Sequence, residues 1–119
     1  MSEPSSQIDY SNLRVPPHSV EAESSVLGGL LVDNSAWDHV ADVLVDCDFY
    51  RHEHKLVYSA IGELISHSRP ADVITVYEHL QALDKGGEVG GLGYLNALAQ
   101  YVPSAGNIRR YAEIVRERA

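Results

Sequence analysis

Apolar residues recur at helical spacing in successive segments of this 119-residue chain. Trp37, Val40, Ala41 and Leu44 follow the i, i+3, i+4, i+7 pattern of an amphipathic helix. The same spacing recurs in residues 57–64, 73–80, 95–102 and 108–115. The β-branched run in "DVITVY" could form a strand, but no partner strand is evident elsewhere, so we predict a helix there as well. The fold class predicted is all-α: a small helical bundle over about 17–85, closed by a C-terminal helical hairpin over about 91–119.

Local signals set the expected boundaries. Residues 1–14 are polar and aperiodic, which predicts a disordered tail before a domain spanning 15–119. Ser19 is the expected N-cap of the first helix, Asn34 or Ser35 of the second, and Asp72 of the fourth. Ser104 is the expected cap after the turn of the hairpin. The glycine-rich residues 86–93 predict an irregular, flexible loop.

The apolar stripes predict the core. Its expected members are Leu27, Leu30, Trp37, Val40, Leu44, Val57, Ile61 and Leu64. The Gly28-Gly29 pair interrupts the first stripe, although glycine inside a helix costs about 1 kcal/mol relative to alanine. Either another helix approaches closely at this pair or the helix kinks there.

The two hairpin helices carry apolar residues on a second face. In so small a domain, a second apolar face predicts a subunit contact; the alternative is that its tyrosines simply line the surface. The residues expected in this contact are Tyr94, Leu98, Tyr101, Ile108, Tyr111, Ile114 and Val115.

The charge is strongly negative. Nine Lys and Arg against seventeen Asp and Glu give a net charge of −8, which disfavours binding to phosphates. Asp38, Asp42 and Asp46 are spaced to share one face of a helix. A solvated face is the favoured interpretation, and a docking face for a basic partner is the alternative.

Motifs for catalysis are scarce. Neither Lys55 nor Lys85 follows a glycine, so the chain has no phosphate-binding G-x-x-x-x-G-K-[ST] loop. In His52-Glu53-His54 the histidines are two residues apart, which does not suit a shared metal on a helix. We therefore predict no catalytic, cofactor-binding or metal-ligating residues. The single cysteine, Cys47, excludes an intrachain disulfide and fits a reducing cytoplasm; no signal peptide or membrane span is expected.

Several segments together resemble a known family. "VPPHSVEAESSVLGGLLVDNSAWDHVADVL", "DFYRHEHKLVYSAI", "PADVITVYEHL", "VGGLGYL" and "PSAGNIRRYAEIVRERA" resemble the N-terminal domain of the bacterial replicative DNA helicase of the DnaB type. The glycine-rich "KGGEVGGLG" and the stretch with five aspartates depart from the common pattern.

This resemblance implies a function in replication. Hairpins would pair between subunits, so that six such domains form the collar of a hexamer that docks primase and, in some species, a helicase loader. A RecA-like ATPase domain, absent from this chain, would use ATP and Mg²⁺ to translocate 5′ to 3′ on single-stranded DNA. The final helix has no stop signal, as expected of a chain cut from a longer one. Two alternatives remain open at this point: contact of the collar with single-stranded DNA, or an independent small enzyme.

Overall fold

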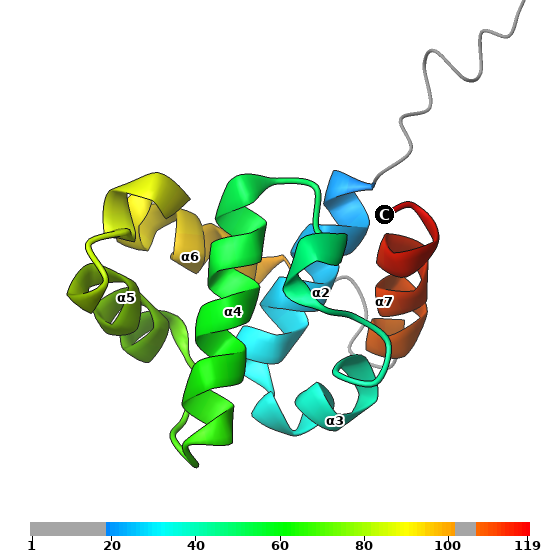
Figure 1. The fold of residues 1–119 in the computed structure, drawn as a ribbon, viewed down its shortest axis with the longest axis horizontal. Helices are drawn as coiled ribbons and strands as arrows, with labels where there is room; N and C mark the ends of the chain where they lie inside the picture. Colours follow the sequence, from blue (N-terminus) through cyan, green and yellow to red (C-terminus); the bar gives the residue numbers. More distant parts are fainter. Residues whose placement is uncertain (1–18, 102–106) are drawn as a thin grey trace, which may run out of the picture.

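A computed structural model describes residues 19–101 and 107–119 and shows only helices and turns within them. Figure 1 shows the arrangement of the helices. The all-α prediction is confirmed, and the β-branched run at residues 73–76 is helical. The α-helices are α2 (Val20–Val32), α3 (Trp37–Val40), α4 (His52–Ser66), α5 (Val73–Ala82), α6 (Gly91–Gln100) and α7 (Ile108–Glu117); short 3₁₀ helices are η1 (Asn34–Ala36), η2 (Asp46–Asp48) and η3 (Gly86–Val89). The predicted tail at 1–14 and the predicted cap Ser104 lie outside the described residues.

Helix α2 is the central element of the bundle. It packs against α7, α6 and α4, while α5 packs against α4 and α6 (Figure 1). The two helices predicted as a hairpin, α6 and α7, therefore both rest on α2. Their positions depend on how closely α2 lets them approach.

The Gly28-Gly29 pair lies where α2 meets α6 and α7. A Cβ atom on Gly28 would lie 2.2 Å from the carbonyl oxygen of Leu98 and 2.7 Å from that of Tyr101. A Cβ on Gly29 would lie 2.8 Å from Cδ1 of Ile108. Of the two interpretations of this pair, the structure supports close approach, because the end of α6 occupies the space a side chain would need.

The core includes nearly all of the residues predicted for it. Leu27, Leu30, Val40, Leu44, Val57, Ile61 and Leu64 are buried. Trp37 is only partly buried, and its ring packs against Tyr58 with the two centroids 5.1 Å apart. Trp37 therefore sits at the edge of the core.

Two predicted helix caps are present. The Ser19 side chain accepts a hydrogen bond from the Ala22 N–H, and Asp72 accepts one from the Thr75 N–H. Both satisfy amides that have no partner within the first turn of a helix.

The predicted cap of the second helix is wrong. Asp33 caps η1, with its carboxylate accepting hydrogen bonds from the N–H and the hydroxyl of Ser35. The Asn34 amide instead donates to the carbonyls of Leu30 and Ala71 and accepts from the Ala71 N–H. Asn34 thus joins the end of α2 to the segment before α5.

The glycine-rich segment is more regular than predicted. It forms η3, and Gly91 and Gly93 belong to α6. Val89 is 1% exposed and anchors η3 to the core. Gly90 and Gly91 have φ values of 86° and 72°, which glycine adopts without strain. The buried side chain of Val89 and the left-handed conformations of Gly90 and Gly91 therefore order this segment, although its composition predicted an irregular loop.

Candidate protein interaction surface

Three residues predicted for the subunit contact lie in the core of the chain. Leu98 is 2% exposed, Ile108 is 7% exposed and Val115 is 2% exposed. Their side chains are buried with the rest of the apolar core and offer no surface to a partner. The prediction that these three residues lie in the subunit contact is therefore wrong, since residue spacing does not show which of two apolar faces of a helix turns inward.

The other four predicted contact residues keep some surface. Tyr101, at the end of α6, is 41% exposed. Tyr111 and Ile114 are partly buried and lie three residues apart on α7, so they share a face of that helix. Tyr94 is also partly buried, but its hydroxyl group is engaged in a hydrogen bond with His54 of α4 and is not available to a partner. The candidate contact surface is therefore reduced to Tyr101, Tyr111 and Ile114.

Arginines of α7 hold the α3 region against this helix. The Arg109 guanidinium donates to the His39 carbonyl at 3.3 Å, and that of Arg116 donates to the Val43 carbonyl at 3.4 Å. Arg116 also lies 4.0 Å from the Asp48 carboxylate. Two basic side chains of the C-terminal helix thus make contacts within the domain.

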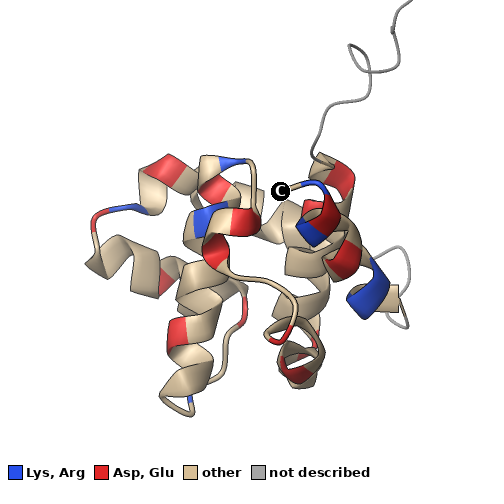
Figure 2. Cartoon of the chain, turned by 45° about the vertical axis from the view of Figure 1, so that its right-hand side comes forward, with Lys and Arg blue, Asp and Glu red and all other residues tan. Residues whose placement is uncertain are grey.

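Acidic residues alternate with the arginines on α7, as Figure 2 shows. Arg109 and Arg110 both pair with Glu113, and Arg110 also pairs with Glu117. These carboxylates would repel a phosphate backbone approaching the arginines. The geometry of α7 therefore gives no support to the alternative of a DNA contact.

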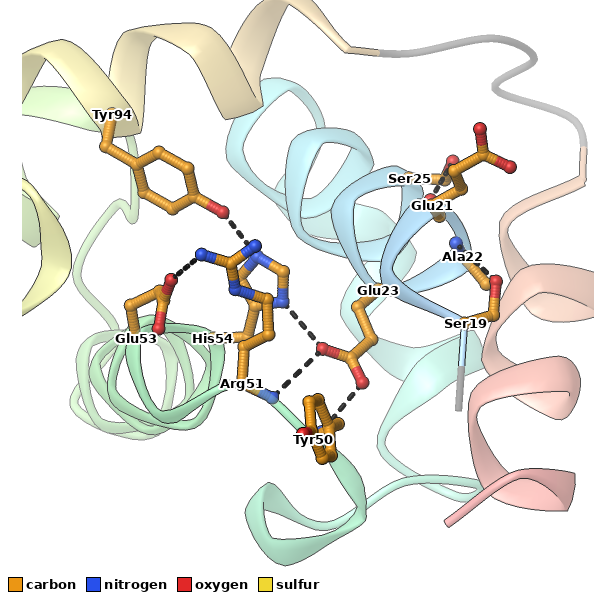
Figure 3. A network of polar contacts seen from close by, with 10 residues as sticks. All are labelled: Ser19, Glu21, Ala22, Glu23, Ser25, Tyr50, Arg51, Glu53, His54 and Tyr94. Atoms are coloured by element: carbon orange, nitrogen blue, oxygen red, sulfur yellow. Dashed lines mark hydrogen bonds and ion pairs between the residues drawn. The ribbon is translucent and has the colours of Figure 1, made fainter. Parts of the chain in front are cut away.

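A buried polar network joins α2, α4 and α6 (Figure 3). Glu23 on α2 and His54 on α4 are 1% and 0% exposed. A Glu23 carboxylate oxygen lies 2.6 Å from Nδ1 of His54, and Nε2 of His54 lies 2.6 Å from the Tyr94 hydroxyl. With Glu23 ionised, Nδ1 carries the proton and donates to the carboxylate, while Nε2 accepts from the Tyr94 hydroxyl.

Glu23 also receives backbone N–H groups at the start of α4. Its carboxylate accepts from the Tyr50 N–H at 2.7 Å and from the Arg51 N–H at 3.5 Å. Arg51 occupies the N-cap position of α4 but supplies no side-chain cap. A carboxylate from α2 thus stabilises the positive end of α4.

The groups of this network satisfy one another. A carboxylate, an imidazole and a hydroxyl in series resemble a nucleophilic triad, but burial raises the pKa of the Tyr94 hydroxyl and disfavours its ionised form. Each group is satisfied by the next, as buried polar groups require. Sequence patterns do not predict this network, because His54 lies 31 residues from Glu23 and 40 residues from Tyr94 along the chain.

The two histidines of His52-Glu53-His54 face different partners. His52 lies 2.9 Å from Glu88, and this hydrogen bond lowers the pKa of the Glu88 carboxyl group. His54 binds Glu23 in the core. Across residues 19–101 and 107–119, no three His, Cys, Asp or Glu side chains come together as a metal site would require.

The predicted helical alignment of Asp38, Asp42 and Asp46 is wrong. Helix α3 ends at Val40, a turn follows, and Asp46 begins η2. All three carboxylates are nevertheless exposed, and that of Asp46 accepts a hydrogen bond from the Ser59 hydroxyl at 3.1 Å.

Fold and surface together define a small all-helical domain with an apolar core, a buried polar network, and exposed apolar and acidic residues. None of the described helices is long and apolar enough to cross a membrane. The DnaB-like helicase N-terminal domain family model matches residues 15–117. The chain therefore belongs to this family, the N-terminal domain of a replicative DNA helicase.

Comparison with individual proteins supports this family assignment. The replicative DNA helicase DnaB of Pasteurella multocida is 44% identical over 105 residues, which are 88% of this chain and 22% of that relative. That of Leifsonia xyli is 45% identical over 111 residues, which are 93% of this chain and 24% of the relative. The chain thus spans about a quarter of the length of these relatives. The crystal structure of the N-terminal domain of DnaB helicase from Mycobacterium tuberculosis matches with a TM-score of 0.83 and 42% identity, covering 87% of this chain and 73% of that one.

Proposed function

We propose that this chain is the assembly and partner-docking domain of a replicative DNA helicase. Six copies would form the collar of a hexamer, and the collar would recruit primase during DNA replication. The observation that carries this proposal is the family match over residues 15–117, in relatives about four times longer than this chain. A further domain of the parent protein would hydrolyse ATP with Mg²⁺ and unwind duplex DNA in the 5′ to 3′ direction.

The described surface supports a role in binding proteins. Tyr101 is exposed at the end of α6, while Tyr111 and Ile114 present a partly exposed face of α7. Tyrosine is enriched at protein interfaces because it combines a large apolar area with a polar tip. We propose that these three residues contribute to the contact between neighbouring copies. A helicase loader would be a further partner, and the bacterial cytoplasm the site of action.

The position of this surface depends on the rigid core beneath it. Gly28 admits the backbone of α6 against α2, and the hydrogen bond between Tyr94 and His54 fixes the other end of α6 to α4. A contact surface held by its scaffold loses less conformational entropy when it binds. The buried network would therefore serve assembly indirectly, by keeping α6 in one place.

The test is the oligomeric state of the full-length protein carrying Tyr101→Glu. Native mass spectrometry should show fewer hexamers than in the wild type, because a carboxylate would be placed in the contact between copies. Ile74→Glu is the matched control, since Ile74 is 54% exposed on α5, a helix that carries none of the three proposed contact residues. Hexamers that resist Tyr101→Glu as fully as Ile74→Glu would contradict the proposed contact.

A further inference from the structure

A depression of about 670 Å³ lies where η2, the start of α4 and the end of α7 meet. The loop residues Cys47, Phe49 and Tyr50 line it, together with Lys55 of α4 and Arg118 at the end of α7. We call these five residues the η2 depression. Tyr50 is 62% exposed, while Phe49 is buried. The η2 depression therefore combines an exposed aromatic ring with two cations.

The two cations have no partner among the residues that the structure describes. The side chains of Lys55 and Arg118 form no hydrogen bond or ion pair with them, and neither pairs with the chain end at Ala119, which also borders the depression. Asp48 is a further neighbour, but its carboxylate already accepts a backbone N–H and lies 4.0 Å from Arg116. In a chain of net charge −8, two unpaired cations at one depression indicate an anionic occupant.

Helix α2 begins close to this depression. Glu23, in the first turn of α2, accepts a hydrogen bond from the Tyr50 N–H at 2.7 Å. Ser19, the N-cap of α2, precedes Glu23 by four residues, which is about one helical turn of ~5.4 Å. Helix α2 also packs against α7, and Figure 1 shows the end of α7 beside the start of α2. Residues 1–18 therefore join the described fold about one turn from a residue that lines the depression.

The sequence of residues 1–18 contains one group that suits the η2 depression. Ile8, Asp9 and Tyr10 place a carboxylate between two large apolar side chains. Asp9 lies ten residues before Ser19, and ten residues span up to about 35 Å when extended, so the reach is sufficient. Glu3 is the other acidic residue of this range, and its neighbours in the sequence are serine and proline.

We infer that Ile8, Asp9 and Tyr10 dock in the η2 depression of the same chain. The Asp9 carboxylate would contact Lys55 and Arg118, and the two apolar side chains would cover the exposed aromatic ring. A polar, aperiodic sequence is typical of segments that become ordered only on contact with a binding site. Covalent attachment gives such a segment a high effective concentration, so a weak contact suffices. This cover would keep other anions from the two cations, a role separate from assembly.

Cys47 provides the test, because it is the only cysteine of the chain, is exposed and lines the depression. In the whole chain, Asp9→Lys and Arg118→Gln should each raise the rate at which uncharged N-ethylmaleimide modifies Cys47 about threefold, as expected when an exposed charge contact is lost. High salt should raise the rate for the wild type in the same way. Two matched controls, Glu3→Lys and Arg69→Gln, should react like the wild type, since Arg69 is an exposed arginine after α4 that does not line the depression.

A nitroxide spin label on Cys47 locates the segment directly. At concentrations where the chain is a monomer, the label should broaden the amide NMR signals of residues 8–10 more than those of residues 1–4. Asp9→Lys should abolish most of this difference. In a mixture of spin-labelled chain and unlabelled ¹⁵N chain, the signals of the ¹⁵N chain should stay sharp, because the contact lies within one chain.

Three results would overturn the inference. Equal modification rates and equal broadening for the wild type and Asp9→Lys would show that the segment does not dock. An equal rise in rate with Glu3→Lys would show a general effect of charge rather than a contact of Asp9. Broadening of the ¹⁵N chain in the mixture would show that the segment reaches a second copy instead. None of these results bears on the proposed contact through Tyr101, which the mass of the chain tests separately.

Discussion

Replacement of Gly28 by alanine tests how α6 is held against α2. The added methyl group would lie 2.2 Å and 2.7 Å from two carbonyl oxygens of α6, and backbone atoms cannot move aside as a side chain can. Overpacking of a core typically costs ~1–3 kcal/mol, and so short an approach puts the cost near the upper end. Alanine regains about 1 kcal/mol of helix propensity. The expected net loss is therefore about 2 kcal/mol.

Thermal and urea unfolding followed by circular dichroism would measure this loss. For a domain of this size, ~2 kcal/mol corresponds to a fall in Tm of roughly 8–15 °C. Gly93→Ala is the matched control, because Gly93 lies in α6 and a Cβ there would meet nothing within 4 Å. This control should gain about 0.5–1 kcal/mol from the same change of residue.

The change in stability caused by Gly29→Ala should lie between those caused by Gly28→Ala and Gly93→Ala. Its Cβ would meet the end of the flexible Ile108 side chain at 2.8 Å, which can rotate away at a small cost. A Gly28→Ala variant as stable as the wild type would show that the close approach of α6 does not explain this glycine. Equal effects of Gly28→Ala and Gly93→Ala would refute the reasoning as well.

Three further changes test individual contacts. Tyr94→Phe should lower the free energy of unfolding by about 1–3 kcal/mol, because it leaves Nε2 of the buried His54 without a hydrogen-bond donor. An unfolding free energy in urea equal to that of the wild type would argue against the network. Burial raises the pKa of Tyr58 from 10.0 to about 12, so the unfolded chain ionises first and stability should fall by about 2 kcal/mol as the pH rises from 10 to 12. Tyr58→Phe should not show this loss of stability between pH 10 and 12. A pH profile of stability identical to that of the wild type would refute the contribution of Tyr58. Asn34→Ala should lower Tm by several degrees, because it leaves the N–H of Ala71 without its partner; an unchanged Tm would count against this bridge.

Helical periodicity predicted most of the fold because each apolar stripe is local. Residues such as Leu27, Leu30, Val57 and Ile61 are buried since one face of their own helix must be covered, whatever covers it. Which of two apolar faces turns inward is not local. Leu98, predicted to lie in the subunit contact, is buried because α6 packs on α2 at the glycine pair.

The length of the second helix could not be read from spacing. The Val45 N–H donates to the Asp48 carboxylate at 2.9 Å, and the Leu44 carbonyl accepts from the Tyr58 hydroxyl. Both backbone groups would otherwise extend α3, so these competing bonds end it early. Asp48, which is not one of the three aspartates predicted to share a helix face, thus helps to interrupt that face.

The buried network escaped prediction for a related reason. Glu23 lies in the first turn of a helix, where a carboxylate is expected to stabilise the dipole from the solvent side. It is buried instead, because His54 and the backbone N–H groups at the start of α4 satisfy it. These partners come together only through tertiary packing.

The most direct test of the proposed assembly function is the mass of this chain in solution, measured by light scattering over micromolar concentrations. We expect the mass to rise from 13.1 kDa towards twice that value, and Tyr101→Glu to keep it at the mass of the monomer. A wild-type mass of 13.1 kDa at every concentration would contradict the claim that the surface of α6 and α7 suffices to pair two copies.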